Sequence, residues 1–271
     1  ARSLTSSARI VRLSPVRQRN FGFPCVFSTV IGFGLYAATY LVPVFLGRVR
    51  GYNSLQIGTT VFVTGVAQIA STVLAARLSQ RVDARWTISA GLLLFAASRW
   101  LFSAMTPDWG CAALFWPQVL RGFAIMLCIV PSVNMALNGF AMAELRYASG
   151  LFNLMRNLGG AIGIAVVNTW LQDQSRIHVA RFGESLGESG RHVGEVVAQL
   201  AGRIGQLTAD SSHALLMAQG ELGRLVSRTA LTLAFDDVFR LMAWMFVASL
   251  LLVPFCRTPP HSAQGAFLEA H

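Results

Sequence analysis

Hydrophobic residues along the chain gather in long runs that are separated by short polar segments. A helix needs about 20 mostly apolar residues to cross the roughly 30 Å hydrocarbon core of a bilayer. The pattern therefore predicts an all-α fold, a polytopic membrane helix bundle with six transmembrane helices. These are expected over residues 21–47, 54–76, 86–105, 112–137, 148–171 and 238–255.

The composition agrees with this pattern. Only 13% of the 271 residues are charged and the mean hydropathy is +0.53, whereas soluble domains carry about 25% charged residues. The formal net charge is +10, but the arginines lie mostly in the gaps between apolar runs, so the sequence shows no nucleic-acid patch. The cysteines lack metal-ligand spacing, and we expect them to be small packing residues: Cys25, Cys111, Cys128 and Cys256.

The positions of the arginines predict the orientation. Ten of them lie in the segments that six crossings would place on one side, and the short loops on the other side hold only Arg48 and Arg50. Cytoplasmic loops are enriched in Lys and Arg, so we expect both ends of the chain in the cytoplasm. The segments expected from this topology are a cytoplasmic basic arm (1–20), transmembrane helices one to five (21–171), an extracytoplasmic loop (172–235), the last transmembrane helix (236–257) and a cytoplasmic tail (258–271).

The segment 172–235 is polar and glycine-rich, with weak helical spacing. We expect one or two surface helices there, in a loop that lies on the bilayer or the bundle, or that docks a partner. The chain begins with Ala1 and a basic segment, from which we expect that a further segment precedes it.

Three arginines fall well inside the predicted spans, Arg99, Arg121 and Arg156, and Arg240 lies near the start of the sixth. An arginine near the bilayer centre costs about 2.5–3.5 kcal/mol on insertion scales. Each of the three must therefore face a cavity, find a partner or snorkel to an interface.

The fourth run carries a concentration of polar residues. Gln118 and Arg121 are three residues apart and share a helix face, and Gly122 allows another backbone to approach Arg121. Pro117 fits a helix start. Asn134 is expected either to hydrogen-bond to another helix or to line a path.

The fifth run combines two stripes. Gly159 and Gly163 form a small-xxx-small face for close helix packing. Asn153, Arg156 and Asn157 form a polar stripe at i, i+3 and i+4. A helix of this kind can line a path while it packs tightly on a neighbour, which favours a transporter but also fits a packed bundle.

The sequence contains no catalytic motif that we recognise. All five histidines lie in the predicted outer loop or tail, and there is no Ser/His/Asp spacing, phosphate loop or H-E-x-x-H. We therefore expect no enzyme, no cofactor and no metal site. Transport by this chain would need an ion gradient, with a proton gradient expected, or another chain.

Several motifs resemble those of the major facilitator superfamily. Residues 76–85 look like its G-x-L-x-D-R-x-G-R cytoplasmic loop, with Arg77, Arg81, Asp83 and Arg85, although the leading glycine is missing and Asp83 is displaced. Residues 116–131, 156–163 and 233–239 are similar to segments of fourteen-helix EmrB/QacA-type drug:proton antiporters. The resemblance runs from about residue 15 to 255.

The resemblance implies that this chain is the carboxy-terminal half, spans nine to fourteen. In that frame Arg121 takes the place of the fourth-helix arginine of a half, and Gly159, Gly160 and Gly163 resemble the fifth-helix glycine motif. The family implies a rocker-switch exporter of the bacterial inner membrane that exchanges protons for drugs or other amphipathic small molecules. Related pumps work with a periplasmic adaptor and an outer-membrane channel.

The amino-terminal half, with its proton-coupling acids, is not in the sequence, and no acidic residue lies deep in the six spans; Asp236 and Asp237 are expected at an edge. Three alternatives follow: half of a secondary transporter, a truncated scaffold or assembly partner without transport activity, or a small transporter formed by two copies.

Overall fold

The computed structural model describes residues 19–137, 142–188, 190–205 and 211–255. These residues form helices, and no strand occurs among them. The helices are α1 (Arg19–Arg48), α2 (Ser54–Arg81), α3 (Ala84–Phe102), α4 (Cys111–Leu137), α5 (Met142–Glu188), α6 (Gly190–Gly205) and α7 (Ser211–Ser249), which continues into the short 3-10 helix η3 (Leu250–Phe255). The expected arm (1–20) lies almost wholly outside the described residues, and the tail (258–271) lies wholly outside them.

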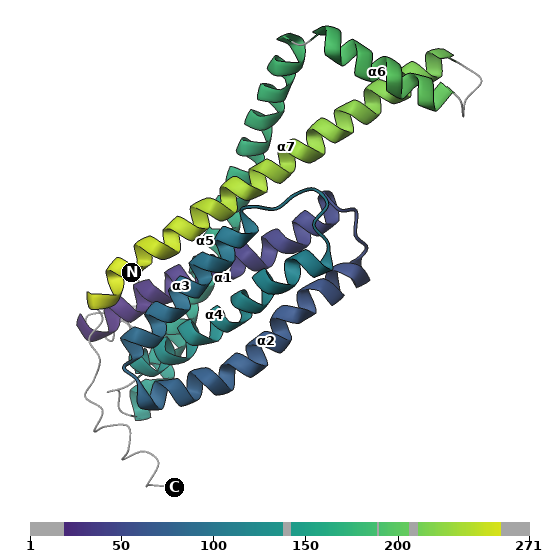
Figure 1. Cartoon of the computed structure of the whole chain (residues 1–271). Helices are drawn as coiled ribbons and strands as arrows, with labels where there is room; N and C mark the ends of the chain where they lie inside the picture. Colours follow the sequence, from purple (N-terminus) through teal and green to yellow (C-terminus); the bar gives the residue numbers. More distant parts are fainter. Residues whose placement is uncertain (1–18, 138–141, 189, 206–210, 256–271) are drawn as a thin grey trace.

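Helices α1 to α4 and the adjoining parts of α5 and α7 lie side by side in a bundle (Figure 1). Helix α4 is central, since it packs against α2, α3 and α1; α5 packs on α1, and α7 packs on α3 and α5. The start of α1 and the end of α7 lie at the same end of the bundle (Figure 1). The predicted all-α membrane bundle is confirmed.

Five of the six expected spans meet the length and hydropathy of a membrane helix: α1, α2, α4, α5 and α7. The expected span 86–105 falls on α3, which does not meet them. Arg85 and Arg99 lower the mean hydropathy of this 19-residue helix. Helix α3 is still about 28 Å long and packs between α4 and α7.

The expected outer loop, 172–235, is mostly helical. Helix α5 continues for 47 residues to Glu188, and α7 already begins at Ser211. At 1.5 Å per residue α5 is about 70 Å long and the 28-residue α2 about 42 Å, so α5 and α7 extend past the bundle, with α6 packed on α7 (Figure 1). We call this part, residues 172–188, 190–205 and 211–228, the projection. The glycines and charges of this segment suggested a loop. Neither interrupts these helices, because a helix face that is exposed can carry polar residues.

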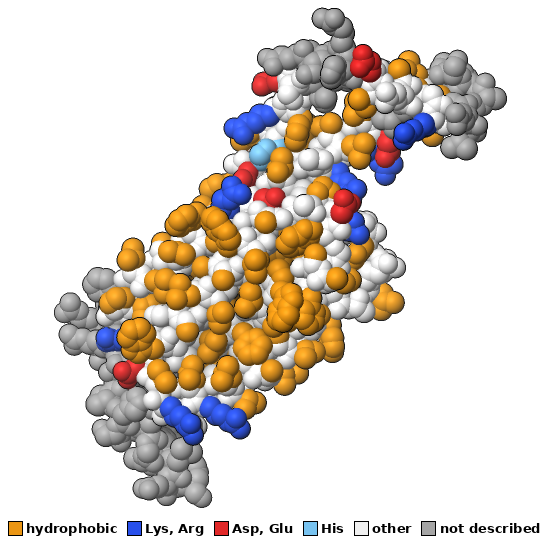
Figure 2. Space-filling model, viewed as in Figure 1, with side chains coloured by type: hydrophobic (Ala, Val, Ile, Leu, Met, Phe, Trp, Pro, Cys, Tyr) orange, Lys and Arg blue, Asp and Glu red, His pale blue; other side chains and the backbone are white. Residues whose placement is uncertain are grey.

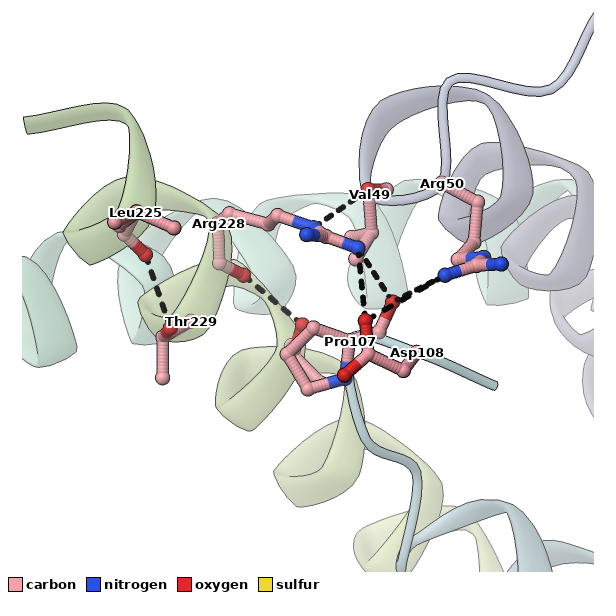
Figure 3. A network of polar contacts seen from close by, with 8 residues as sticks. Val49, Arg50, Pro107, Asp108, Leu225, Arg228 and Thr229 are labelled. Carbon is pink, nitrogen blue, oxygen red and sulfur yellow. Dashed lines mark hydrogen bonds and ion pairs between the residues drawn. The ribbon is translucent and has the colours of Figure 1, made fainter. Parts of the chain in front are cut away.

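Polar contacts fix the base of the projection (Figure 3). Arg228 of α7 donates from Nε to the Val49 carbonyl at 2.9 Å and from Nη2 to the Pro107 carbonyl at 2.7 Å. Arg228 and Arg50 each lie 3.6 Å from the Asp108 carboxylate. The turn after α1 and the loop after α3 are thereby joined to α7.

Two further features order this end of the molecule. His178 Nε2 of α5 lies 2.8 Å from Asp237 Oδ2 of α7, which connects the two long helices. Gly51 has φ +67°, a left-handed conformation that favours glycine and lets the chain turn back after α1. Asn53 and Gln56 then form a capping box at the start of α2.

The surface is apolar in the middle and charged at both ends. Figure 2 shows a broad hydrophobic band between charged side chains at the far end of the bundle and others at the base of the projection. The band is the surface expected in contact with lipid or another apolar partner. Exposed apolar side chains include Phe62, Ile69, Trp86, Trp116, Trp244 and Leu251.

Candidate transport site

Gln118 is fully buried where α4 crosses α2. Its Nε2 donates to the Thr60 carbonyl at 3.1 Å, and its Oε1 accepts a short hydrogen bond from the Thr64 hydroxyl. One turn along, a Cβ on Gly122 would lie 2.8 Å from the Thr64 carbonyl oxygen and 2.6 Å from the Ala67 Cβ. The glycine therefore permits the close approach of α2. The Gln118 amide then forms its hydrogen bonds with α2 at this crossing.

Arg121 is 3% exposed and donates from Nη1 to the Ala38 carbonyl of α1 at 3.2 Å. Its Nε is buried and makes no hydrogen bond to the described residues. It faces the bundle as expected and does not snorkel. Gln118 and Arg121 were expected to share a face, and both are buried, but Gln118 contacts α2 whereas Arg121 contacts α1. Helix α4 thus joins α1 to α2 through polar side chains.

Arg99 of α3 is a second fully buried arginine, so the alternative that it snorkels is wrong. Its Nη2 donates to the Ser98 hydroxyl at 3.0 Å, and its guanidinium lies 4.8 Å from the Phe102 ring centroid and 5.4 Å from that of Phe239. Nε and Nη1 have no partner among the described residues.

Helices α1 and α5 meet backbone to backbone, as the glycines predicted. A Cβ on Gly159 would overlap the Thr29 carbonyl, and one on Gly163 would lie 2.7 Å from the Phe33 carbonyl oxygen. The contact is reciprocal, because a Cβ on Gly32 of α1 would overlap the carbonyl of Arg156. The third glycine of the motif, Gly160, leaves room for the Tyr36 ring.

The predicted polar stripe borders this contact. Asn153 and Asn157 are exposed and Arg156 is half-buried. Arg156 donates from Nη2 to the Asn153 side chain, and Asn157 accepts a hydrogen bond of 2.8 Å from the Tyr36 hydroxyl. Polar groups and glycines therefore follow the same edge of α5.

A second tyrosine–asparagine pair continues the stripe. Tyr40 donates to Asn168 Oδ1 at 2.8 Å. Tyr36 and Tyr40 are one helical turn apart, and Asn157 and Asn168 are three turns apart. The sequence analysis did not select the tyrosines or Asn168; their i, i+4 and i, i+11 spacing was the available signal. We call Tyr36, Tyr40, Asn153, Arg156, Asn157 and Asn168 the α1–α5 polar face.

Two other residues of α4 can be compared with the sequence analysis. Pro117 lies inside α4, which begins at Cys111, so the prediction that it starts a helix is wrong. Its carbonyl accepts a hydrogen bond of 2.9 Å from the Ser98 hydroxyl of α3. Asn134 is exposed on α4.

The predicted cytoplasmic loop motif spans a tight helix junction. Arg77 and Arg81 are exposed near the end of α2, Asp83 is the residue before α3, and Arg85 lies in the first turn of α3. The motif is at the end of the bundle opposite to the projection.

Asp236 was expected at the edge of the last span, which stays a prediction; α7 begins 25 residues earlier, so Asp236 lies within the helix. Its side chain is 8% exposed, and Oδ1 accepts a hydrogen bond from the Met105 backbone N–H at 3.2 Å. It therefore joins α7 to the loop after α3.

The Major Facilitator Superfamily model matches residues 2–164. The chain is 32% identical over 254 residues to the colistin resistance protein EmrB of Acinetobacter baumannii, covering 93% of this chain and 49% of the relative. It is 26% identical to the multidrug export protein EmrB of Escherichia coli K12, covering 99% and 51%. It is 24% identical to the fatty acid resistance protein FarB of Neisseria gonorrhoeae, covering 94% and 49%. The chain spans about half the length of these curated relatives.

Proposed function

Because the chain belongs to the major facilitator superfamily, we propose that it acts as the carboxy-terminal half of a proton-coupled exporter of drugs or other amphipathic small molecules. The observation that carries this proposal is the match of nearly the whole chain to half of relatives that are named for drug or fatty acid resistance. Transporters of this architecture place the substrate path between two halves.

In this proposal the α1–α5 polar face lines or braces the path. Its asparagines lie beside a helix contact made through glycine, so the polar groups border a closely packed pair of helices. Gln118, Arg121 and Gly122 on α4 and Asn134 at its surface complete the candidate path or switch residues. The acids that couple proton entry to export are assigned to the amino-terminal half, and the proton gradient is the proposed energy source.

We assign both ends of the chain to the cytoplasmic side of the bacterial inner membrane, on the charge bias of the short loops. The loop motif of Arg77, Arg81, Asp83 and Arg85 then faces the cytoplasm, and the projection lies outside. The exposed apolar side chains Leu215, Leu216 and Met217 on the projection support docking of a periplasmic adaptor that leads to an outer-membrane channel.

The test is Arg121→Ala in the full-length transporter. The substitution removes the buried guanidinium that joins α4 to α1, and we expect loss of drug resistance with unchanged amounts of protein in the membrane. Arg146→Ala is the matched control, because Arg146 is an exposed arginine, and it should leave resistance intact. Normal resistance in the Arg121→Ala strain would contradict the assignment.

A further inference from the structure

A basic cleft lies between the end of α1 and the part of α7 that enters the projection. It has a volume of about 770 Å³. Four of its described lining residues are arginines, Arg48, Arg50, Arg224 and Arg228, and Glu221 is the one acid among them. Four arginines against one acid make the cleft strongly basic.

The four arginines divide into two fixed and two available guanidinium groups. Arg50 and Arg228 are held by backbone carbonyls and by Asp108 (Figure 3). Arg48 is exposed, and Arg224 is 84% exposed with a loose 3.6 Å contact to the Glu221 carboxylate. An anion can therefore recruit Arg48 and Arg224 without breaking the fixed network.

The floor of the cleft is accessible backbone. Gly51, Gly220 and Gly223 line it, and a Cβ built on any of them would meet nothing within 4 Å. The space is open, and no side chain of these residues shields the peptide groups from a ligand.

The cleft lies at the base of the projection, where Arg228 joins α7 to the turn after α1. Figure 2 shows charged side chains at the base of the projection, beyond the apolar band. A lipid headgroup occupies this depth in a bilayer. Arg48 and Arg50 are also the arginines on the short loops at this end, against the charge bias of the chain.

We propose that this cleft is a phosphate-binding site whose ligand is a phosphate oxyanion, carried by an anionic phospholipid headgroup or free in solution. Guanidinium groups bind phosphate through paired N–H···O bonds, and basic pockets of membrane proteins bind lipid headgroups in this way. A bound phosphate would bridge α1 and α7, and so connect the projection to the bundle.

The test uses the full-length protein in detergent, with binding measured by microscale thermophoresis. The probes are dioctanoyl phosphatidylglycerol, dioctanoyl phosphatidylcholine and inorganic phosphate. The double variant Arg48→Gln/Arg224→Gln should weaken binding of the anionic probe by about tenfold or more. Glu221→Gln should strengthen it, because it removes the carboxylate that competes with an anion for Arg224.

Arg181→Gln/Arg203→Gln is the matched control, since both arginines are exposed on the projection outside the cleft; it should bind as the unchanged protein does. Arg48→Lys/Arg224→Lys keeps the charge without the paired donors, and should bind more weakly than the parent but more tightly than the glutamine variant. Circular dichroism confirms that each variant is folded.

Tight binding of phosphatidylglycerol alone, sensitive to the cleft variants, identifies a lipid headgroup as the ligand. Binding of inorganic phosphate with the same sensitivity identifies a free oxyanion. Absence of binding by both anionic probes overturns the proposal. So does binding that the control pair weakens as much as the cleft pair.

Discussion

Two long helices join the bundle in opposite ways. Helix α5 packs on α1 through glycine, with main chain against main chain at Gly159 and Gly163 and the Tyr36 ring against Gly160. Helix α7 packs on α3 through rings: Phe95 and Phe246 stack with centroids 4.6 Å apart, and Phe102 and Phe239 at 5.1 Å. Atoms added at the glycines would therefore disrupt the α1–α5 contact. Atoms removed from the rings would weaken the α3–α7 contact.

The difference follows from what each pair of helices exposes. The α1–α5 contact borders exposed polar groups, whereas the α3–α7 side presents an apolar groove lined by residues such as Trp100 and Trp244. In lipid, apolar side chains gain little from the hydrophobic effect, because lipid tails are equally apolar, and close packing supplies most of the stability. Glycine contacts and aromatic stacking are two ways to pack helices closely. Of the two, only the glycine contact of α1 and α5 leaves polar side chains exposed beside it, where they can line a path.

The largest effect is expected from Gly159→Val. A Cβ at this position overlaps the Thr29 carbonyl, and a backbone atom cannot move aside as the end of a side chain can. We expect a loss of about 3 kcal/mol in unfolding free energy, with a matching loss of export. Denaturant titration in mixed micelles measures the first quantity and drug resistance the second.

Gly150→Val on the same helix is the control, since a Cβ there would meet nothing within 4 Å. This variant makes the same Gly→Val change in the same helix. It therefore measures the change in unfolding free energy that valine itself causes in a helix, without the clash. Equal stability of the two variants would show that α1 and α5 do not approach as closely as described.

A smaller loss is expected from Phe246→Ala. The ring stacks on Phe95, and its removal leaves a cavity rather than a clash. Because lipid tails are as apolar as the ring, the transfer term is small in a membrane and the cavity term remains. With about 24 cal/mol per Å³ of cavity, roughly 2 kcal/mol of unfolding free energy should be lost. The same titration measures it, with Leu251→Ala as control because Leu251 is 73% exposed. A loss as large as that of Gly159→Val would remove the distinction between the two contacts.

The α1–α5 contact could be predicted in part from sequence, and the α3–α7 contact could not. The spacing of Gly159 and Gly163 identifies a packing face on one helix, because the helical period determines which residues align. Nothing local shows that Phe246 will meet Phe95, since their pairing depends on how the chain crosses the bundle. The sequence analysis expected one or two surface helices in a loop over 172–235, and it missed the length of the projection for a related reason. Each glycine lowers helix propensity only by about 1 kcal/mol, and the tertiary contacts of α5, α6 and α7 outweigh that cost.

Arg99→Met should raise the free energy of unfolding, whereas the two preceding substitutions lower it. Arg99 is fully buried beside Phe102 and Phe239, with Nε and Nη1 unpartnered among the described residues. Replacing a buried charge by an apolar side chain of similar length often stabilises, so we expect a gain of about 1 kcal/mol. Thermal unfolding in detergent measures it. A destabilised variant would show that the cation holds the α3–α7 contact together.

The smallest effect is expected at the outer edge of the α3–α7 contact, where Trp100 and Trp244 meet edge to face with centroids 6.3 Å apart. Both rings are more than half exposed, so lipid can replace part of each partner's contacts. A double-mutant cycle with Trp100→Leu and Trp244→Leu should give a coupling of about 0.5 kcal/mol, the lower end for aromatic pairs. The coupling of the buried Phe95–Phe246 pair is measured in the same way. A larger coupling for the tryptophans would place the main α3–α7 contact at the lipid-facing edge rather than in the core. The comparison with the glycine contact of α1 and α5 would then apply to Trp100 and Trp244 instead of the phenylalanines.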